Sequence, residues 1–552
     1  MEDKSAGKNI TCPFCFKTFK DWQVHFRMEV REDNPLFEPQ KDQKYENFWS
    51  EYGGTTEVSV SDVASQIGES NGSLPYYRRV YDPHDSRHKD AFIKEDPQAN
   101  PPCTVLIHDE DGMVIGAQDS FGKETTERVC PYCHNPLPEG YGRYPVKFIS
   151  TIGVTGAGKT VYLSQLCYNM QEKLGEYGIS AYNMTASATR YMKGNIVSKG
   201  KSLPNTTNAD QLLQPLFFKF GHRNACTQTF VFYDIAGENL VSPENDGGGT
   251  RLSARAAKYG KFILHSDAII FLINPSQFVK EDGAGNDDDK AKKAEKYVPT
   301  ESLNIISQLF ETTKDPKALH ATPLAVCISQ VEKPLAVAQG AIVGLNICKS
   351  ILGQQWLPDM QLPVIETEGL PKTIPAFNAE DYNKVRDLVE NYASKKLAAL
   401  STTLENDFHC YNYFMIESIG VPLVKKRKSS GTVYQVPDKD PTPKRIIEPL
   451  LWILTILLID GSGRPVVAVE GKINEPKGWR CPSCNKWCSD TVTFCPKCGV
   501  NKKGEWRCRK CKGLNPRSAE WCESPGCNTN RSGGSRGFFA GLFSRISRGR
   551  GA

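Results

Sequence analysis

A glycine-rich octapeptide at residues 153–160 constrains the fold of this chain more than any other feature of the sequence. Its letters, GVTGAGKT, match the pattern G-x-x-x-x-G-K-[ST] in full. An apolar run at 146–152 precedes it and predicts a buried strand, and residues 161–166 predict the start of a helix. A strand, a glycine loop and a helix in this order are the context that the pattern requires. We therefore expect an α/β domain built around this loop.

The residue types of the octapeptide suit the phosphates of a nucleotide. Its glycines let backbone N–H groups close around phosphate oxygens, beside the positive end of the following helix. We expect Lys159 to reach the β- and γ-phosphates and the hydroxyl of Thr160 to bind Mg²⁺. The alternative is an ordinary strand-to-helix turn with a surface lysine. The residues predicted to bind the nucleotide here are Gly153, Val154, Thr155, Gly156, Ala157, Gly158, Lys159 and Thr160.

A second acidic motif supports the phosphate loop. A β-branched and aromatic run at 229–233 predicts a strand that ends at Asp234, with Gly237 three residues further on. A carboxylate at a strand end beside the loop would hold Mg²⁺ through water, and the N–H of Gly237 would contact the γ-phosphate. In these motifs the chain resembles the translation-factor-like (TRAFAC) class of P-loop GTPases, whose third motif is Asp-x-x-Gly. The resemblance implies a nucleotide hydrolase in which Lys159, Asp234, Gly237 and Glu238 act.

Two further positions of that class are less well matched. Glu238 stands where Ras-like members carry a glutamine that positions water, and a solvated charge is the alternative for it. The class also carries a threonine that covers Mg²⁺ between the first helix and the second strand. Thr206 and Thr207 are candidates for this threonine, although threonine is common in any polar loop.

The motifs that would recognise the base depart from the class pattern. Residues 329–332 are Ser-Gln-Val-Glu where the class carries Asn/Thr-Lys-x-Asp. Glu332 could accept two hydrogen bonds from guanine, whereas Gln330 cannot supply the cation of the lysine. Ser418 is a weak counterpart of the Ser-Ala turn of the class. We therefore expect GTP, with ATP as the alternative, and Glu332 and Ser418 as base-binding residues.

The rest of the central region predicts a doubly wound, mainly parallel α/β sheet of the P-loop NTPase type over residues 145–460. Two polar stretches, 281–297 and 425–445, are predicted to be surface loops. Further strands are expected at 215–220, 267–273, 323–328 and 411–416, and a closing apolar helix at 445–458.

Twelve of the 19 cysteines form six close pairs, which predict about three zinc sites rather than disulfides. The first two pairs share a Cys-Pro-aromatic-Cys sequence and predict one split zinc ribbon with a structural role. Together with the Asp-Ile-Ala-Gly-Glu sequence at 234–238, they resemble the prokaryotic double-GTPase group, which is associated with multi-component bacterial conflict systems. The predicted zinc ligands are Cys12, Cys15, Cys130, Cys133, Cys481, Cys484, Cys495, Cys498, Cys508, Cys511, Cys522 and Cys527.

The last four pairs form a tandem repeat, in which Trp-Arg-Cys-x2-Cys is followed after ten residues by another cysteine. The repeat resembles small zinc fingers of the Ran-binding-protein type, which include binders of single-stranded RNA and of ubiquitin. The residues that carry either function are not matched: Asn515 is present, but Pro516 stands at the stacking position. Zinc is therefore expected, and the ligand of the fingers is left open.

Charge is distributed unevenly along the chain. Residues 472–552 hold 17 Lys and Arg against 5 Asp and Glu, a net charge of +12, and the preceding residues have a net charge of −7. Apolar residues recur at helical spacing between Phe538 and Ile546 and predict an amphipathic basic tail. Such a tail suits nucleic acid, an anionic membrane surface or a groove on a protein partner, and packing against the chain itself is the alternative.

These observations predict a zinc-bearing nucleotide switch. We expect an Mg²⁺-dependent hydrolase of GTP or ATP, cytoplasmic or peripherally bound to a membrane, because no secretory signal or spanning segment is seen in the sequence. A zinc-finger scaffold with a degenerate GTPase domain, and an effector that binds nucleic acid, are the alternatives. The expected parts are 1–140 (zinc ribbon with insertion), 145–460 (GTPase-like), 472–500 and 501–530 (zinc fingers) and 531–552 (basic tail).

Overall fold

The fold is described from a computed structural model. The structure describes residues 7–52, 78–204, 214–240, 254–274, 299–312, 321–330, 398–458 and 478–529 apart from gaps of one to three residues, together with some positions at 377–390 and residues 469–470. The expected polar loop at 281–297, the basic tail, Thr206 and Thr207 lie outside these residues.

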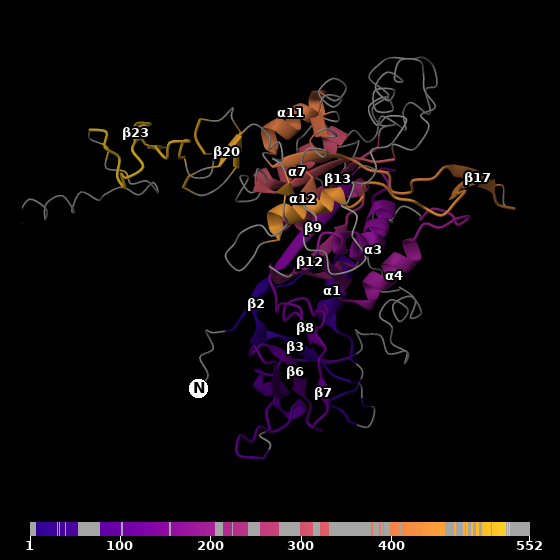
Figure 1. Ribbon diagram of the computed structural model, residues 1–552. Helices are drawn as coiled ribbons and strands as arrows, with labels where there is room; N and C mark the ends of the chain where they lie inside the picture. Colours follow the sequence, from indigo (N-terminus) through magenta and orange to yellow (C-terminus); the bar gives the residue numbers. More distant parts are fainter. Residues whose placement is uncertain are drawn as a thin grey trace, which may run out of the picture.

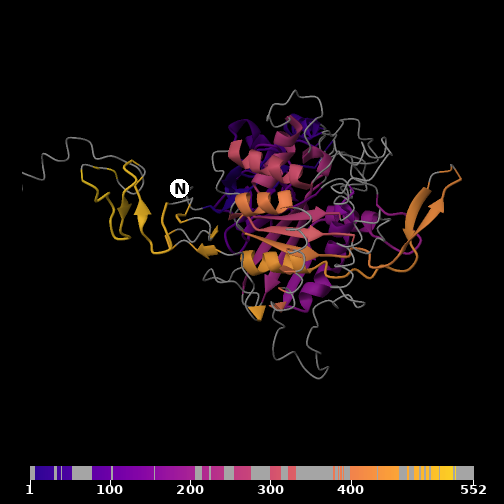
Figure 2. The same cartoon turned by 90° about the horizontal axis from the view of Figure 1, so that it is seen from above.

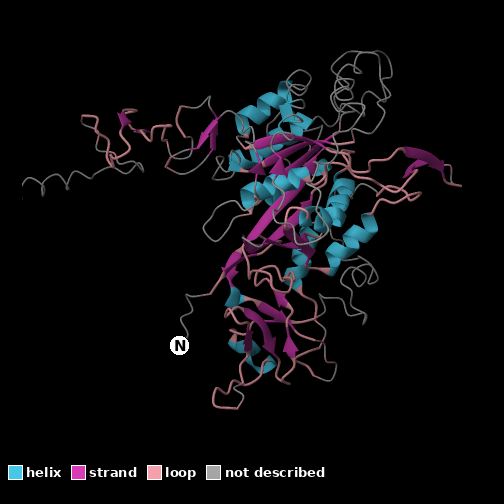
Figure 3. Ribbon diagram, viewed as in Figure 1, coloured by secondary structure: helices cyan, strands magenta, loops and turns pink. Residues whose placement is uncertain are grey.

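The body of the molecule is a mixed α/β structure around a seven-stranded, mostly parallel sheet (Figures 1 and 3). Strands β12, β9, β13, β14 and β16 run parallel, whereas β10 and β11 pair antiparallel with their neighbours at one edge. The central parallel strands are apolar along most of their length because helices cover both of their faces. The strands, in spatial order, are β10 (Ile179–Asn183), β11 (Leu216–His222), β12 (Ala225–Asp234), β9 (Val146–Gly153), β13 (Ala268–Ile273), β14 (Leu324–Ile328) and β16 (Tyr411–Met415).

Helices cover the two faces of this sheet, as Figure 2 shows from above. One face packs against α3 (Lys159–Gly175), α4 (Ala186–Asn195) and α12 (Glu448–Leu457). The other face packs against α5 (Ala254–Leu264), α7 (Pro299–Thr312) and α11 (Ala398–Asp407). The sequence therefore predicted the doubly wound character and the five parallel strands correctly, and the closing helix is α12. It did not predict β10 or α4.

An N-terminal module lies below the sheet in the view of Figure 1 and shares a core cluster with the helices of the second face. Its cysteine-bearing ends are joined by an insertion whose described residues form short, paired strands and a helix. The module consists of β1 (Asn9–Thr11), β2 (Thr18–Lys20), β3 (His25–Arg27), α1 (Gln43–Glu51), β4 (Val80–Tyr81), β5 (Leu106–His108), β6 (Val114–Gln118), β7 (Glu124–Thr125) and β8 (Arg128–Val129), with the short 3-10 helices Asp21–Gln23 and Ser86–Ala91.

This module shares one apolar core with the sheet. The ring of Phe16 meets those of Phe148 in β9 and Phe262 in α5, with centroids 5.6 Å and 5.2 Å apart. The hydroxyl of Tyr233 in β12 donates a 2.7 Å hydrogen bond to the carbonyl of Pro13. The zinc-ribbon sequence and the phosphate-loop sheet are consequently packed as one body.

Residues 425–445 contain a β-hairpin, although their polar and proline-containing sequence predicted a loop. Strand β17 (Leu423–Arg427) pairs antiparallel with β18 (Val433–Pro437), and Gly431 turns between them with φ +85°. Alternation around a glycine turn is the pattern of a hairpin, and the run of cations obscured it. The remaining short strands are β15 (Phe377–Asn378), β19 (Val469–Glu470), β20 (Gly478–Arg480), β21 (Trp487–Ser489), β22 (Trp506–Arg507) and β23 (Leu514–Asn515).

Within the described ranges, no helix combines the length and the apolar character that crossing a bilayer would require.

Candidate functional site: the phosphate loop and its metal-binding neighbours

The glycine loop runs from the end of β9 to the start of α3. Gly153 has φ +151°, and a Cβ atom there would lie 2.3 Å from the carbonyl oxygen of Leu272. Gly158 has φ +81°, and a Cβ atom there would lie 2.9 Å from the side-chain nitrogen of Gln330. The backbone conformation therefore favours glycine at both positions, and at Gly153 the space beside the Leu272 backbone requires it as well. Val154 and Thr155 lie outside the described residues.

Lys159 and Thr160 open α3 and are held by the groups around them. The Nζ of Lys159 is buried and donates a 3.0 Å hydrogen bond to the carbonyl of Gly153, which places the cation under the loop. The hydroxyl of Thr160 donates to a carboxylate oxygen of Asp234 at 2.9 Å. Lys159, which is predicted to bind phosphate, therefore lies close to Thr160 and Asp234, which are predicted to hold Mg²⁺.

The strand order explains this meeting. Strand β12 is the parallel neighbour of β9, and Asp234 pairs in register with Thr151, two residues before the loop. The carboxyl ends of parallel strands meet at one edge of a sheet, which is where α/β proteins bind their ligands. The parallel pairing of β12 with β9 therefore places Asp234 beside the loop.

Asp234 is buried, and a second hydroxyl reaches it. Tyr191, from α4, donates to the same carboxylate oxygen at 3.0 Å. Burial raises the pKa of Asp234, while the positive charge of Lys159 and the bonds from Thr160 and Tyr191 act in the opposite direction. Tyr191 was not predicted, because only the packing of α4 beside α3 brings it to the site.

Side chains from the ends of β13 and β14 support the loop from the other side. Ser329 Oγ donates to the carbonyl of Ala157 at 2.7 Å, and Gln330 Nε2 donates to the carbonyl of Gly156 at 2.6 Å. Asn274 Nδ2 contacts the same Gly156 carbonyl at 3.2 Å and the side-chain oxygen of Gln330 at 3.3 Å. Ser329 and Gln330, which begin the segment that departs from the base motif, are therefore in contact with the phosphate loop. Their position at the end of a predicted strand was the sequence signal for this contact.

Other predicted site residues are not brought to this cluster by any described contact. Gly237 is buried in the 3-10 turn Gly237–Leu240 after β12, and the side chain of Glu238 lies outside the described residues. Glu332 lies outside them as well. Ser418 is buried after β16, and two strands, β14 and β13, separate β16 from β9. The base-binding roles of Glu332 and Ser418 therefore stay predictions.

The first two cysteine pairs form a four-thiol cluster, although they are far apart in sequence. Cys12 and Cys133 have Sγ atoms 3.6 Å apart, and Cys15 and Cys130 have theirs 3.7 Å apart. All four Sγ atoms lie within 4.8 Å of one another. A disulfide needs about 2.05 Å between its sulfurs, whereas four Zn–S bonds of about 2.3 Å place sulfurs about 3.8 Å apart. The cluster therefore fits a closed tetrahedral zinc site.

Four cysteine pairs share one backbone turn. In each, the first cysteine N–H bonds to the carbonyl five residues later, and its carbonyl accepts from the N–H four residues later. The residue at that fourth position has positive φ in every case. The turns begin at Cys12, Cys130, Cys495 and Cys508, and the residues with positive φ are Phe16, His134, Gly499 and Lys512.

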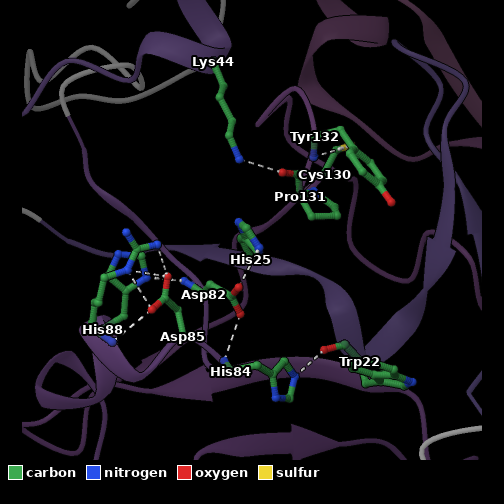
Figure 4. Close-up of polar contacts among 11 residues, drawn as sticks. Trp22, His25, Lys44, Asp82, His84, Asp85, His88, Cys130, Pro131 and Tyr132 are labelled. Atoms are coloured by element: carbon green, nitrogen blue, oxygen red, sulfur yellow. Dashed lines mark hydrogen bonds and ion pairs between the residues drawn. The ribbon is translucent and has the colours of Figure 1, made fainter.

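One polar contact joins the Cys130 turn to α1 and another lies within the turn itself (Figure 4). Lys44 of α1 donates to the carbonyl of Pro131 at 3.0 Å, and the N–H of Tyr132 points to the Cys130 sulfur at 3.4 Å. Nearby, His25 lies 3.4 Å from Asp82, and burial lowers the pKa of His25 to about 4. His25 is therefore a neutral packing residue at physiological pH.

A second four-thiol cluster lies in the last finger. Cys508 and Cys527 have Sγ atoms 3.6 Å apart, and Cys511 and Cys522 have theirs 3.4 Å apart, so this cluster also fits zinc. Cys481, Cys484 and Cys498 lie outside the described residues. Asn515 is buried and accepts a 2.7 Å hydrogen bond from the N–H of Glu523. Its amide therefore organises the finger.

The chain was compared with known proteins. No protein-family model matches it. It is 28% identical over 236 residues to the putative ESX-1 scaffolding and assembly protein SaeC of Mycolicibacterium smegmatis; the match covers 41% of this chain and 54% of the relative. The chain thus spans about half the length of that curated relative.

Three solved structures show low similarity. The G domain of the T. maritima FeoB iron transporter is 12% identical, with 36% of this chain and 80% of that chain covered and a TM-score of 0.16. Sup35 complexed with GMPPNP is 10% identical, with 50% of this chain and 38% of that chain covered and a TM-score of 0.19. The SRb-GTP/SRX signal recognition particle receptor complex of Chaetomium thermophilum is 11% identical, with 50% of this chain and 92% of that chain covered and a TM-score of 0.19. TM-scores of this size do not establish a shared fold, so the architecture above rests on the strand order of this chain.

Replacing Asp234 with asparagine is expected to stabilise the nucleotide-free protein. Burial raises the pKa of Asp234 in the folded protein above the ordinary value of 3.8. The protonated side chain therefore contributes its full stabilisation below pH 3.8, and this contribution is lost as the pH rises through the pKa of the folded protein. At pH 7, Asp234→Asn should therefore raise the free energy of unfolding by about 1 kcal/mol, while Thr160 and Tyr191 can still donate to the amide oxygen. Thermal melting from pH 4 to 8 measures this.

The exposed Asp111→Asn variant is the matched control, because its carboxylate is largely solvated. A lower melting temperature for Asp234→Asn than for the wild type at pH 7 would contradict the expectation.

Proposed function

We propose that this protein is an Mg²⁺-dependent nucleotide-binding switch that hydrolyses GTP, with ATP as the alternative substrate. The observation that carries the proposal is the cluster of Lys159, Thr160 and Asp234 at the carboxyl ends of β9 and β12. A buried cation beneath a glycine loop suits the β- and γ-phosphates. A hydroxyl 2.9 Å from a carboxylate suits Mg²⁺, which prefers oxygen ligands.

In this switch, the residues of the loop and of the segment after β12 have separate roles in binding and hydrolysis. The loop N–H groups bind phosphate oxygens, and Lys159 turns from the Gly153 carbonyl toward the β- and γ-phosphates. Thr160 would bind Mg²⁺ through its hydroxyl and Asp234 would hold it through water, and the metal would supply charge neutralisation at the phosphates. Gly237 contacts the γ-phosphate through its N–H, and Glu238 orients the attacking water. Loss of the γ-phosphate then releases the segment after β12 and changes its contacts with partners.

The contacts of Ser329 and Gln330 favour assignment to the TRAFAC class. Ser329 and Gln330, the first two residues of the Ser-Gln-Val-Glu sequence, hydrogen-bond to the phosphate loop. The base motif of that class follows a strand that ends near the loop. β13 separates β14 from β9, and Ser329 and Gln330 connect the end of β14 to the loop. With Glu332 and Ser418 as base-binding residues, we propose guanine as the preferred base. We also propose that the chain belongs to the double-GTPase group and acts in a bacterial conflict system. The cysteine turns and the Asp-Ile-Ala-Gly-Glu sequence support this assignment.

The zinc sites are proposed to be structural parts of this switch. The two four-thiol clusters would hold one Zn²⁺ each, and the shared turn at Cys495 supports a third with Cys481, Cys484 and Cys498 as the other ligands. The fingers and basic tail would recognise a partner, which is a protein, nucleic acid or anionic membrane.

The scaffold alternative is favoured by one comparison. The relative from Mycolicibacterium smegmatis bears the name of a scaffolding and assembly protein, and this chain shares 28% identity with it. In that case the nucleotide site would be a static platform, and the zinc modules would hold the partners.

Phosphate release distinguishes the two functions. We expect the purified full chain with Mg²⁺ to release several equivalents of phosphate from GTP, and more slowly from ATP, at a rate that falls at least tenfold without Mg²⁺. Bound nucleotide without multiple turnovers would support the scaffold. Failure to bind either nucleotide would overturn both the switch and the nucleotide-locked platform.

A further inference from the structure

The β17–β18 hairpin projects from the body of the molecule. Figures 1 and 2 show it extending beyond the sheet and its helices, on the side away from β20 and β23. It forms a two-stranded sheet of its own. An isolated hairpin is marginally stable in water, so its base must be anchored elsewhere.

Contacts at its base supply that anchor. The N–H groups of Gly200 and Leu203 bond to the carbonyls of Pro437 and Gln435 at 3.0 Å and 3.4 Å. Leu423 packs on a small apolar cluster that includes Ile419 and Val421. The base is thus fixed to the body, and the outer part of the hairpin extends away from the described elements (Figures 1 and 2).

The outer part carries a dense positive charge. Lys425, Lys426, Arg427 and Lys428 are consecutive and exposed, and residues 418–437 contain no acidic residue. Among the described residues no ion pair is formed by these four side chains. The 471 residues that precede the fingers have a net charge of −7, so this hairpin is a cationic element on an acidic body.

The cations are divided between both faces of the ribbon. Side chains alternate along a strand, so Lys425 and Arg427 share one face, and Lys426 lies on the other. Lys428 continues that second face, because its Nζ lies 5.7 Å from the ring of Tyr434, the residue paired with Lys426. A membrane is flat and would meet one face at a time. A partner that matches both faces must present negative charge on two walls.

We propose that the β17–β18 hairpin binds double-stranded DNA by entering its major groove. That groove is about 12 Å wide, admits a two-stranded ribbon and has phosphates along both walls. The groove of double-stranded RNA is too narrow for side chains to enter in this way. Contacts from four cations would be mainly to phosphates, so binding is strongly salt-dependent and independent of sequence.

The test compares the two faces in the full chain. Binding of a labelled mixed-sequence DNA duplex is followed by fluorescence anisotropy between 50 and 200 mM KCl. The first variant is Lys425→Gln with Arg427→Gln, and the second is Lys426→Gln with Lys428→Gln. Each is expected to weaken binding about tenfold or more and to lower the salt slope by about 2, with the fourfold variant lowering it by about 4.

The matched control changes two exposed cations of the N-terminal module, Lys89→Gln with Lys94→Gln. This control should leave the contribution of the hairpin to duplex binding intact. Melting temperatures verify that every variant is folded, and the exposed side chains make a loss of fold unexpected.

Several results would overturn the proposal. Loss confined to one face would exclude entry of the hairpin into the groove, and equal loss in the control would place DNA binding elsewhere. Stronger hairpin-dependent binding to an RNA duplex, or to vesicles containing anionic phospholipid, would replace DNA with that partner. Unchanged DNA affinity in the fourfold variant would remove the hairpin from recognition altogether. None of these outcomes bears on the nucleotide site, which is measured separately.

Discussion

Lys159→Ala is expected to abolish nucleotide binding, with a loss of affinity of at least 100-fold. The ammonium group of Lys159 lies beneath the loop at 3.0 Å from the Gly153 carbonyl, where it can turn to the phosphates without moving the backbone. Charge-assisted contacts to phosphate in a buried site are strong, and alanine offers no replacement. Titration with fluorescent GTP and ATP analogues in the presence of Mg²⁺ measures the loss.

Lys173→Ala is the matched control for this substitution. Lys173 is in the last turn of the same helix and forms a half-exposed ion pair with Glu176 at 3.6 Å. It should bind nucleotide as the wild type does, and both variants should melt within a few degrees of the wild type. Nucleotide affinity retained by folded Lys159→Ala would remove this loop from the phosphate site.

Cys12→Ser is expected to remove one zinc equivalent and to destabilise the whole body, lowering the melting temperature by more than about 10 °C. Cys12 is fully buried, and its thiol is 3.6 Å from that of Cys133, so serine would leave a four-ligand site incomplete. Structural zinc sites contribute about 10–16 kcal/mol of binding free energy to the folded state. Metal analysis and thermal melting, each with and without chelator, measure the effect.

Cys103→Ser serves as its control, because Cys103 belongs to neither four-thiol cluster. It should keep its zinc content and melt close to the wild type. If Cys12→Ser lost zinc without any change in melting temperature, the site would not support the shared core.

The sequence predicted well where chemistry and periodicity coincide. The phosphate loop, the strand ending at Asp234 and the pairing of Cys12 and Cys15 with Cys130 and Cys133 each have a local pattern, and the structure places them together. Buried parallel strands such as β13 and β14 are continuous apolar runs, which the sequence displays directly.

The missed features depend on packing between distant segments. Strands of the N-terminal module are only two to five residues long, too short for an alternating pattern to stand out. Tyr191 reaches Asp234 only because α4 packs beside α3, and nothing local marks it. The hairpin at β17 was hidden because four consecutive cations suggest a solvated loop.

The hydrogen bond from Tyr233 to Pro13 joins the N-terminal module to the sheet that carries the phosphate loop. Tyr233 immediately precedes Asp234, and its ring packs near Phe16 and Phe148 in one aromatic layer. A shortened chain that begins after the second cysteine pair would leave these rings facing water. The domain that carries the phosphate loop is therefore not expected to fold as a separate unit, and a shortened chain that keeps this domain folded should have to keep the N-terminal cysteines.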